Sequence, residues 1–319
     1  MTVYESLEEI PKNFGPTVVT VGNYDGIHCA HRRLIDSICK RAKELKARSA
    51  LVTFDPHPAR ILRPHAGPPL ITPMKRKMEV LSQTGLDAVV VLPFTRDLSL
   101  IPAFEFAEEI LSSRLHAVEI HEGFNFRFGH KAEGDIERLR EFGTKLGFSV
   151  VAHEPMTWGE FVISSSNVRA LLLGGEVGMA RHLLGRVFSI DSTPGRGRGY
   201  GTKYAVPTVN LTRYEELTPA MGVYVTEMLI NGEYFQSVTN VGNRPTFGAD
   251  SFSIESYILN FHPIDLSNDT PIRLSFLRRL RAEKKFPTTE ALKEQIGKDV
   301  VRAQRYFRLR EGVRKTQKV

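Results

Sequence analysis

The sequence has 319 residues, 41% hydrophobic and 25% charged, which leaves room for two globular domains and excludes a disordered chain. Its formal net charge of +7 favours an anionic partner, either the phosphates of a nucleotide or a nucleic acid. The first residues lack the basic and apolar parts of a secretory signal, and no apolar run reaches the roughly 18 residues of a membrane helix. We therefore expect a cytoplasmic protein without a membrane partner.

The first half of the chain alternates strand-like and helix-like segments. A β-branched run at 17–21 indicates a buried strand, a turn follows at 22–26, and apolar residues recur at helical spacing from His28 to about Lys46. The further strands that we expect are 50–54, 88–92, 117–120 and 149–152, with helices at 75–85 and 103–111. Such βαβ units build a parallel sheet, so residues 1–184 are predicted to form an α/β, doubly wound, Rossmann-like domain.

After residue 184 the strand-like segments follow one another without helices between them. Asn231-Gly232 is the pair that most favours a tight type I′ hairpin turn. The strands that we expect here are 223–230, 234–240, 254–261 and 272–280. Apolar residues spaced by three and four from Leu292 to Phe307 predict a final amphipathic helix. Residues 185–319 are therefore predicted to form a small antiparallel β-barrel with a C-terminal helix.

The turn at 22–26 joins the first strand to its helix and has the features of a phosphate site. Its glycines allow the backbone to approach a ligand closely, and the helix N-terminus beyond it offers N–H groups to an anion. His28 and His31 lie three residues apart, so their side chains face the same way and can donate hydrogen bonds to phosphate oxygens. A structural pair or half of a metal site remains the alternative, although no further ligands stand at zinc spacing.

Residues 22–31, Gly-Asn-Tyr-Asp-Gly-Ile-His-Cys-Ala-His, resemble the signature of the HxGH nucleotidyltransferases. The version with Asn-Phe/Tyr-Asp-Gly is similar to prokaryotic FAD synthetase, which is usually fused to riboflavin kinase. The resemblance continues, in the family's order, through residues 53–58, 123–129 and 163–169, and covers essentially the whole chain. It departs at Ala30, where the family usually has glycine. The resemblance implies that AMP is transferred from ATP to FMN, giving FAD and pyrophosphate, with Mg²⁺.

The same resemblance assigns roles to residues of the first domain. The catalytic residues that it implies are His28, His31 and Arg169. The nucleotide-binding residues that it implies are Gly22, Asn23, Asp25, Gly26, Ser164, Ser165 and Ser166. The flavin-binding residues that it implies are Phe54, Pro56, His57, Pro58, Asn125 and Phe128. From the residues alone, the three serines could equally cap a helix, and Phe124, Phe126 and Phe128 alternate as core residues do.

The second half resembles riboflavin kinase. Pro207-Thr-Val-Asn210 matches the family's Pro-Thr-Ala-Asn motif, which implies that Thr208 and Asn210 hold Mg²⁺. Glu255 matches the base that takes a proton from the 5′-hydroxyl of riboflavin. From the residues alone, Glu255 could be a solvent-facing strand residue, and Thr208 and Asn210 could be turn residues. The loop before Pro207 is longer and richer in Gly and Arg than in the family, so an adenylyltransferase with an inactive kinase domain is an alternative.

Two further alternatives differ in substrate or in class. A cytidylyl- or pantetheine-phosphate adenylyltransferase would keep the fold, but those families usually lack the barrel. A nucleic-acid-binding protein would use the Arg-Gly run at 196–199 and the basic C-terminus, but it would leave Glu255 and the two histidines unexplained. We therefore expect ATP, FMN and riboflavin as substrates, no nucleic-acid partner, and a monomer or weak homo-oligomer.

Overall fold

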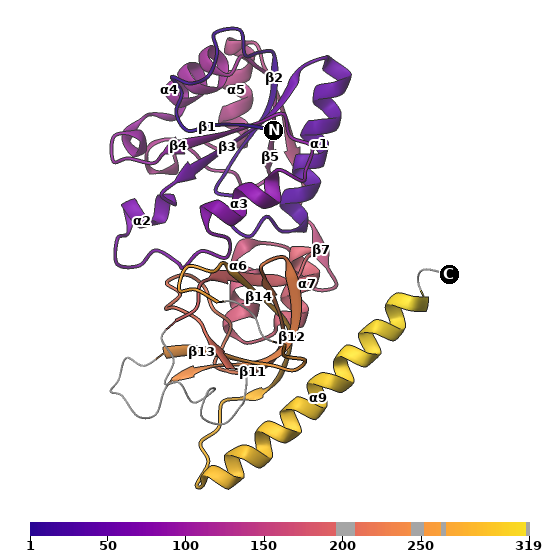
Figure 1. Ribbon diagram of the computed structural model, residues 1–319. Coiled ribbons are helices and arrows are strands. Elements are labelled where there is room, and N and C mark those ends of the chain that lie inside the picture. The colour runs from indigo at the N-terminus through magenta and orange to yellow at the C-terminus, as the bar shows by residue number, and fades with distance from the viewer. Residues whose placement is uncertain (196–207, 244–251, 263–265, 317–319) are drawn as a thin grey trace. The chain divides into compact units, whose positions relative to one another are not determined.

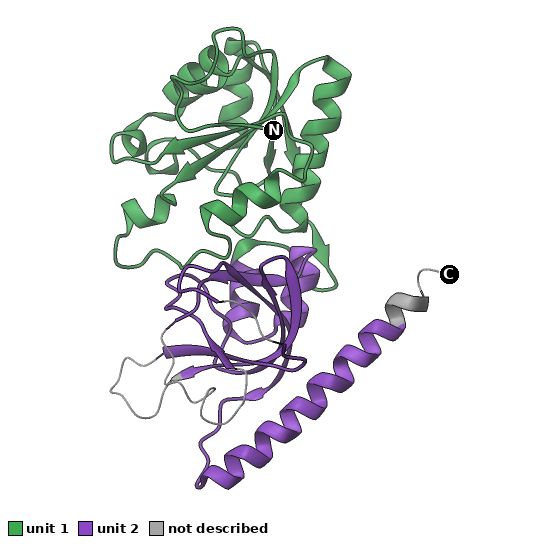
Figure 2. Cartoon of the chain, viewed as in Figure 1, with its two compact units in different colours: residues 1–165 green, residues 166–319 purple. Residues whose placement is uncertain are grey.

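The computed structural model describes residues 1–195, 208–243, 252–262 and 266–316. The chain divides into two compact units, Met1–Ser165 and Ser166–Val319 (Figure 2). This division falls earlier in the chain than the expected domain boundary at residue 184, which stays a prediction. Within the described ranges, no helix is both long and apolar enough to span a bilayer.

Unit 1 is built on a six-stranded parallel sheet in the order β1-β4-β3-β2-β5-β6 (Figure 1). Its strands are β1 (Thr2–Tyr4), β2 (Thr17–Val21), β3 (Arg48–Asp55), β4 (Ala88–Pro93), β5 (Ala117–Gly123) and β6 (Ser149–His153). The central strand β2 is buried along its whole length, because β-branched residues pack well against both neighbouring layers. The expected parallel sheet is confirmed.

Helices cover both faces of this sheet. The longer ones are α1 (Cys29–Leu45), α3 (Met74–Leu81), the π-helical η2 (Phe106–Arg114) and α5 (Ile136–Leu146). On one face, α1 and α3 form a core with Val18 and Leu51. On the other face, η2 and α5 pack against Val19 and Val52. Neighbouring residues of one strand thus point into different cores, as in a doubly wound domain.

Short elements complete unit 1. They are α2 (Pro58–Leu62), α4 (Ala103–Glu105), η1 (Leu98–Leu100), η3 (His130–Ala132), β7 (Thr157–Trp158) and β8 (Phe161–Val162). The sequence predicted neither β1 nor the β7–β8 hairpin, because these short strands are largely exposed and lack a hydrophobic run. The helix expected at 75–85 ends at Leu81.

Unit 2 starts within α6 (Ser165–Leu173) and contains an antiparallel sheet in the order β10-β13-β12-β11-β14-β9. Its elements are α7 (Val177–Leu184), β9 (Phe188–Ser192), β10 (Thr208–Asn210), β11 (Gly222–Ile230), β12 (Glu233–Asn243), β13 (Phe252–Ile258), β14 (Ile272–Ala282) and α9 (Thr289–Thr316). Next to β9 and β10, the Gly195 N–H donates to the Asn210 carbonyl at 2.8 Å and the Thr212 N–H to the Thr193 carbonyl at 2.9 Å. These bonds join the two ends of the sheet and curl it into the expected barrel.

Two local predictions for unit 2 have different outcomes. Asn231 and Gly232 have φ values of 49° and 85°, as a type I′ turn requires, so the hairpin is confirmed. Ala303 and Phe307 of α9 are buried against the outer face of the barrel. Leu292 and Ile296, however, remain 39% and 43% exposed. Only the later part of the predicted apolar stripe therefore packs on the barrel.

Candidate active sites

The predicted motifs of unit 1 meet at the carboxyl edge of its sheet. Strands β3, β2 and β5 are neighbours, and each is followed by one motif. The glycine turn follows β2, the 54–58 segment ends β3 and leads into α2, and residues 124–128 follow β5 (Figure 1). From β2 the chain continues to β3, its neighbour on one side, whereas β5 is the neighbour of β2 on the other side. The direction of the strand order therefore reverses between β2 and β5, which makes this edge a topological switch point. Ligands of open α/β sheets bind at such points.

His28 and His31 are stacked where α1 begins. Their ring centroids are 3.6 Å apart with an interplanar angle of 16°, so the prediction that they face the same way is confirmed. His28 is the N-cap of α1, and its Nδ1 accepts the His31 N–H at 3.3 Å. His28 is only 4% exposed, whereas His31 is half-buried. Because Nδ1 of His28 caps the helix, we expect a phosphate contact from this residue to come through Nε2.

Asp25 and Lys77 hold the glycine turn in place. Asp25 is 2% exposed, and its carboxylate accepts the N–H groups of Ile71 and Thr72 at 3.1 and 2.9 Å. The Lys77 Nζ donates to the Asn23 carbonyl at 2.7 Å. Burial lowers the pKa of Lys77, while the charge of Asp25 acts in the opposite direction. The Asp25 carboxylate therefore binds the protein's own backbone and shapes the turn.

Sequence reasoning missed Lys77, although the sequence carries a signal for it. Lys77, Val80 and Leu81 are the buried residues of α3 and follow helical spacing. A lysine in an apolar stripe is rarely buried without a partner, so this position could have been singled out. Its acceptor, the Asn23 carbonyl, is 54 residues away in sequence and could not have been named.

The serine motif is tied to the glycine turn through Ser165, whose Oγ donates to the Asp25 carbonyl at 2.8 Å. Helix α6 begins at Ser165, so the serines lie where a helix starts, and their capping of it stays a prediction. Ser164 is half-buried. Ser166 and Arg169 lie on α6 within unit 2, three residues apart and therefore close on the helix surface. Their contact with phosphate stays a prediction.

The expected flavin residues include both exposed and core side chains. Phe54 is half-buried and meets Phe94 edge-to-face at 5.5 Å. His57 caps α2, since its Nδ1 accepts the Ala59 N–H at 3.1 Å. Pro58 is the first residue of that helix, a position that suits proline. Pro56 and Asn125 are exposed.

Phe128 is a core residue. It is 7% exposed and stacks on Phe126 with the ring centroids 5.2 Å apart. A core position is the alternative that the sequence left open for this residue, because it alternates with Phe124 and Phe126. Phe124, by contrast, is 52% exposed. The exposed aromatic ring of this motif is therefore Phe124, which the sequence did not single out.

The three predicted kinase residues share one face of the barrel. Asn210 is directly opposite Glu255, and Thr208 is opposite Tyr257, in the antiparallel pair of β10 and β13. Directly opposed residues of such a pair point the same way, and residues two apart on one strand do so too. Glu255 and Asn210 are half-buried and Thr208 is exposed. The Gly-Arg loop and Pro207 lie outside the described residues.

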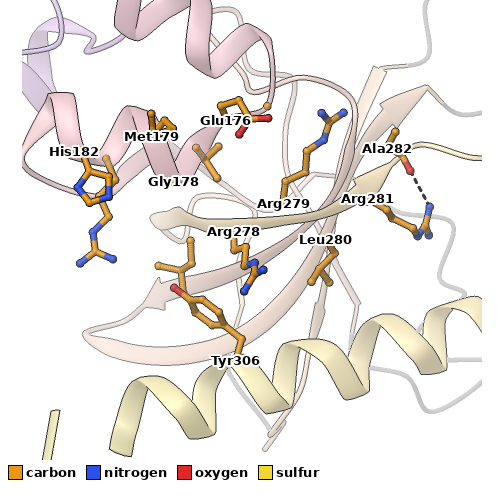
Figure 3. Close-up of a pocket in the computed structure, with 14 residues that line it drawn as sticks. Glu176, Gly178, Met179, His182, Arg278, Arg279, Leu280, Arg281, Ala282 and Tyr306 are labelled. Atoms are coloured by element: carbon orange, nitrogen blue, oxygen red, sulfur yellow. Dashed lines mark hydrogen bonds between the residues drawn. The ribbon is translucent and has the colours of Figure 1, made fainter. Parts of the chain in front are cut away.

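Unit 2 also contains a cavity of about 700 Å³ between α7, β14 and α9 (Figure 3). Four arginines and one glutamate line it, but none of the predicted kinase residues does. Arg279 donates to the Gly174 and Met221 carbonyls at 3.1 and 2.7 Å, and Arg281 pairs with Asp299 at 2.9 Å. Two of the arginines thus serve the fold, and the cavity is distinct from the Thr208–Asn210–Glu255 face.

Comparisons with known proteins agree with both halves of this arrangement. The FAD synthetase family model matches residues 10–167, and the riboflavin kinase model matches residues 184–307. The chain is 30% identical over 316 residues to the bifunctional riboflavin kinase/FMN adenylyltransferase of Buchnera aphidicola subsp. Acyrthosiphon pisum (strain APS), covering 98% of this chain and 100% of that protein. The chain belongs to the bifunctional riboflavin kinase/FMN adenylyltransferase family.

Other relatives carry the same name. The Pseudomonas fluorescens protein is 31% identical, covering 95% of this chain and 97% of its own length. The Escherichia coli (strain K12) protein is 29% identical, covering 92% and 93%. A crystal structure described as a macrolide-efflux protein from Streptococcus pneumoniae has a TM-score of 0.82 at 24% identity, covering 93% of this chain and 96% of that one, and it shows the fold alone.

Family membership gives the activity. The protein is a transferase of FAD biosynthesis that phosphorylates riboflavin to FMN and adenylylates FMN to FAD, with ATP as the second substrate. His28, His31 and Ser165 fall within the FAD synthetase match, whereas Thr208, Asn210 and Glu255 fall within the riboflavin kinase match.

Proposed function

We propose that FMN adenylylation takes place at the carboxyl edge of the unit 1 sheet, with His28 and His31 on the phosphates of ATP. An oxygen of the FMN phosphate attacks the α-phosphorus, the bond from that phosphorus to the α–β bridging oxygen breaks, and pyrophosphate leaves. The two imidazoles donate hydrogen bonds to oxygens that gain charge in the transition state. The observation that carries this proposal is the stacked histidine pair at the N-terminus of α1, where the helix dipole also favours an anion.

The other residues of this site position the substrates. Asp25 and Lys77 fix the glycine turn through buried hydrogen bonds, so that Gly22, Asn23 and Gly26 can approach the nucleotide with their backbone. Ser164, Ser165, Ser166 and Arg169 supply hydroxyl and guanidinium donors for phosphate oxygens. Phe54, Pro56, His57, Pro58 and Asn125 border the flavin, and the exposed ring of Phe124 takes the place of the core residue Phe128 as the aromatic candidate for contact with it.

We place riboflavin phosphorylation on the outer face of β10 and β13. Glu255 accepts the proton of the 5′-hydroxyl of riboflavin as that oxygen attacks the γ-phosphorus of ATP and ADP leaves. The Thr208 hydroxyl and the Asn210 amide oxygen lie on the same face as Glu255 and are ligands of the kind that Mg²⁺ prefers. Bound Mg²⁺ would neutralise negative charge on the ATP phosphates.

The remaining assignments rest on the sequence. We propose that the protein acts in the cytoplasm on small molecules only, without a nucleic-acid partner, as a monomer or weak homo-oligomer. The excess of positive charge would then serve the anionic nucleotides and flavin phosphates.

Separate incubations with the two flavins test this proposal. With ATP and Mg²⁺, riboflavin should give FMN first and then FAD, and FMN should give FAD, as followed by chromatography of the flavins. A protein that converts FMN but leaves riboflavin unchanged would show that Glu255, Thr208 and Asn210 do not form a working kinase site. A protein that binds RNA with a steep salt dependence and converts neither flavin would contradict both assignments.

A further inference from the structure

The hydrogen-bond ladder between β2 and β5 stops before the two strands end. Their pairing runs only to Val19 and Ile120, although β2 continues to Val21 and β5 to Gly123. Beyond that point the Val21 N–H donates to Oε1 of Glu122 instead of to a β5 carbonyl. Glu122 is 3% exposed. A buried side chain thus replaces the ladder bond where the two strands part, at the switch point that holds the proposed ATP site.

A chain of contacts leads from Glu122 to His31. The Thr20 hydroxyl donates to Oε1 of Glu122 at 3.4 Å and is also hydrogen-bonded to the Tyr24 hydroxyl. The Tyr24 ring lies 4.7 Å from the His31 ring, tilted by 50°. Thr20 is fully buried and Tyr24 is 3% exposed, so neither side chain can move without disturbing the core.

Tyr24 also needs an anchor for its backbone. Its φ is +47°, a left-handed conformation that bulky residues rarely adopt. The hydroxyl at the far end of the side chain is held by Thr20, which keeps the ring against His31 despite this strain. The hydrogen bond to Thr20 therefore fixes both the backbone of the turn and the ring that packs against the His31 imidazole.

Burial acts on the pKa of both Glu122 and Tyr24. Burial raises the pKa of Glu122 well above its usual range, and the hydrogen bonds from Val21 and Thr20 only partly oppose this shift. Burial likewise raises the pKa of Tyr24. Burial thus disfavours the charged form of Glu122. Both donors use one oxygen, Oε1, and the carbonyl oxygen of a glutamine could accept them equally well.

We propose that Glu122 is a positioning residue for FMN adenylylation: through Thr20 and Tyr24 it fixes the His31 ring, and through Val21 it holds the parted ends of β2 and β5. It touches neither substrate. This inference rests on the phosphate-binding role proposed above for His31.

Glu119 provides a matched control three residues earlier on β5. It is also buried, at 6% exposure. Its carboxylate binds Arg41 and His121 at 2.8 Å and Ser149 at 3.1 Å, and none of these contacts involves Tyr24 or His31. Replacing Glu119 therefore disturbs the same strand without disturbing the chain of contacts that leads to His31.

The test compares Glu122→Leu, Glu122→Gln, Tyr24→Phe and Glu119→Gln in the full chain. We expect Glu122→Leu to lower kcat of FMN adenylylation by about 10- to 100-fold, because misplaced groups at a reacting centre cost rates of this order. Glu122→Gln should recover most of that rate through its amide oxygen. Tyr24→Phe removes only the hydroxyl and should lower kcat with little change in the KM for FMN, whereas Glu119→Gln should keep the adenylylation rate.

Two readouts in the same protein separate positioning from loss of fold. Riboflavin phosphorylation reports on unit 2, and the fluorescence of Trp158, the single tryptophan, reports on the folding of unit 1. If Glu122→Leu unfolds unit 1, Tyr24→Phe decides the question. Normal kcat in a folded Glu122→Leu or in Tyr24→Phe would overturn the inference, as would an equal loss in Glu119→Gln.

A parallel His31→Ala variant separates this inference from the proposal on which it rests. If His31→Ala keeps its adenylylation rate, the role of His31 is wrong. If His31→Ala loses the rate but Glu122→Leu keeps it, the role of His31 stands and only the role of Glu122 is wrong.

Discussion

Replacing either His28 or His31 by alanine is expected to slow FMN adenylylation by roughly 10²- to 10³-fold, the usual loss when one donor to a developing oxyanion is removed. Both rings lie at the N-terminus of α1 and stack at 3.6 Å, so each variant removes one donor from the proposed phosphate site. Riboflavin phosphorylation should continue at the unsubstituted rate, because Glu255, Thr208 and Asn210 belong to unit 2.

His28 needs a second variant because it also caps α1. Loss of an N-cap costs about 1 kcal/mol of stability. In His28→Ala this loss of stability would be mixed with any loss of catalysis. Asparagine keeps a capping oxygen, so His28→Asn should lose the adenylylation rate while largely retaining the thermal stability of unit 1. His116 is exposed, with φ of 50°, and His116→Asn should change neither quantity. Near-normal turnover in His28→Asn or His31→Ala would refute the assignment.

Replacing Glu255 by glutamine is expected to lower riboflavin phosphorylation by roughly 10²- to 10⁴-fold, the range for loss of a general base. Glutamine keeps the size and hydrogen-bonding capacity of the side chain but cannot take the proton of the 5′-hydroxyl. FMN adenylylation should be unchanged. The measurement is the initial rate of FMN formation from riboflavin at saturating ATP and Mg²⁺.

Glu227 offers the matched control for this variant. It lies on β11 of the same barrel, where its carboxylate pairs with Arg310 of α9 at 3.3 Å. Glu227→Gln should keep the kinase rate, since Glu227 takes no part in the Thr208–Asn210–Glu255 face. An equal loss of kinase activity in Glu227→Gln and Glu255→Gln would point to damage of the barrel rather than to removal of a base.

The layers of the fold were predictable because they follow from local patterns. β-branched runs marked the central strands of unit 1, and the Asn231-Gly232 pair marked a hairpin whose backbone has the required positive φ values. Strand β1 was not predicted, because three partly exposed residues are too few to show a hydrophobic periodicity. The exposure of Leu292 and Ile296 was not predicted for another reason. A hydrophobic stripe shows which face of a helix can pack, but it does not show how far the barrel extends beneath that helix.

The candidate sites were predictable in outline only. Motifs that follow β2, β3 and β5 had to converge once these strands were parallel neighbours. The contacts that hold His31 and the turn depend on long-range partners, such as Lys77 with Asn23 and Glu122 with Val21, 54 and 101 residues apart. Phe128 shows the limit of a motif, because an alternating aromatic run does not reveal which ring lies in the core.

The central claim, that the two reactions use two separate sets of residues around His31 and Glu255, is tested most directly by mixing two variants that each lack one activity. His31→Ala incubated with riboflavin and ATP should accumulate FMN, and Glu255→Gln should leave riboflavin unchanged. An equimolar mixture should form FAD, since FMN released by the first variant is adenylylated by the second. Formation of FAD by His31→Ala alone at the unsubstituted rate would contradict the account.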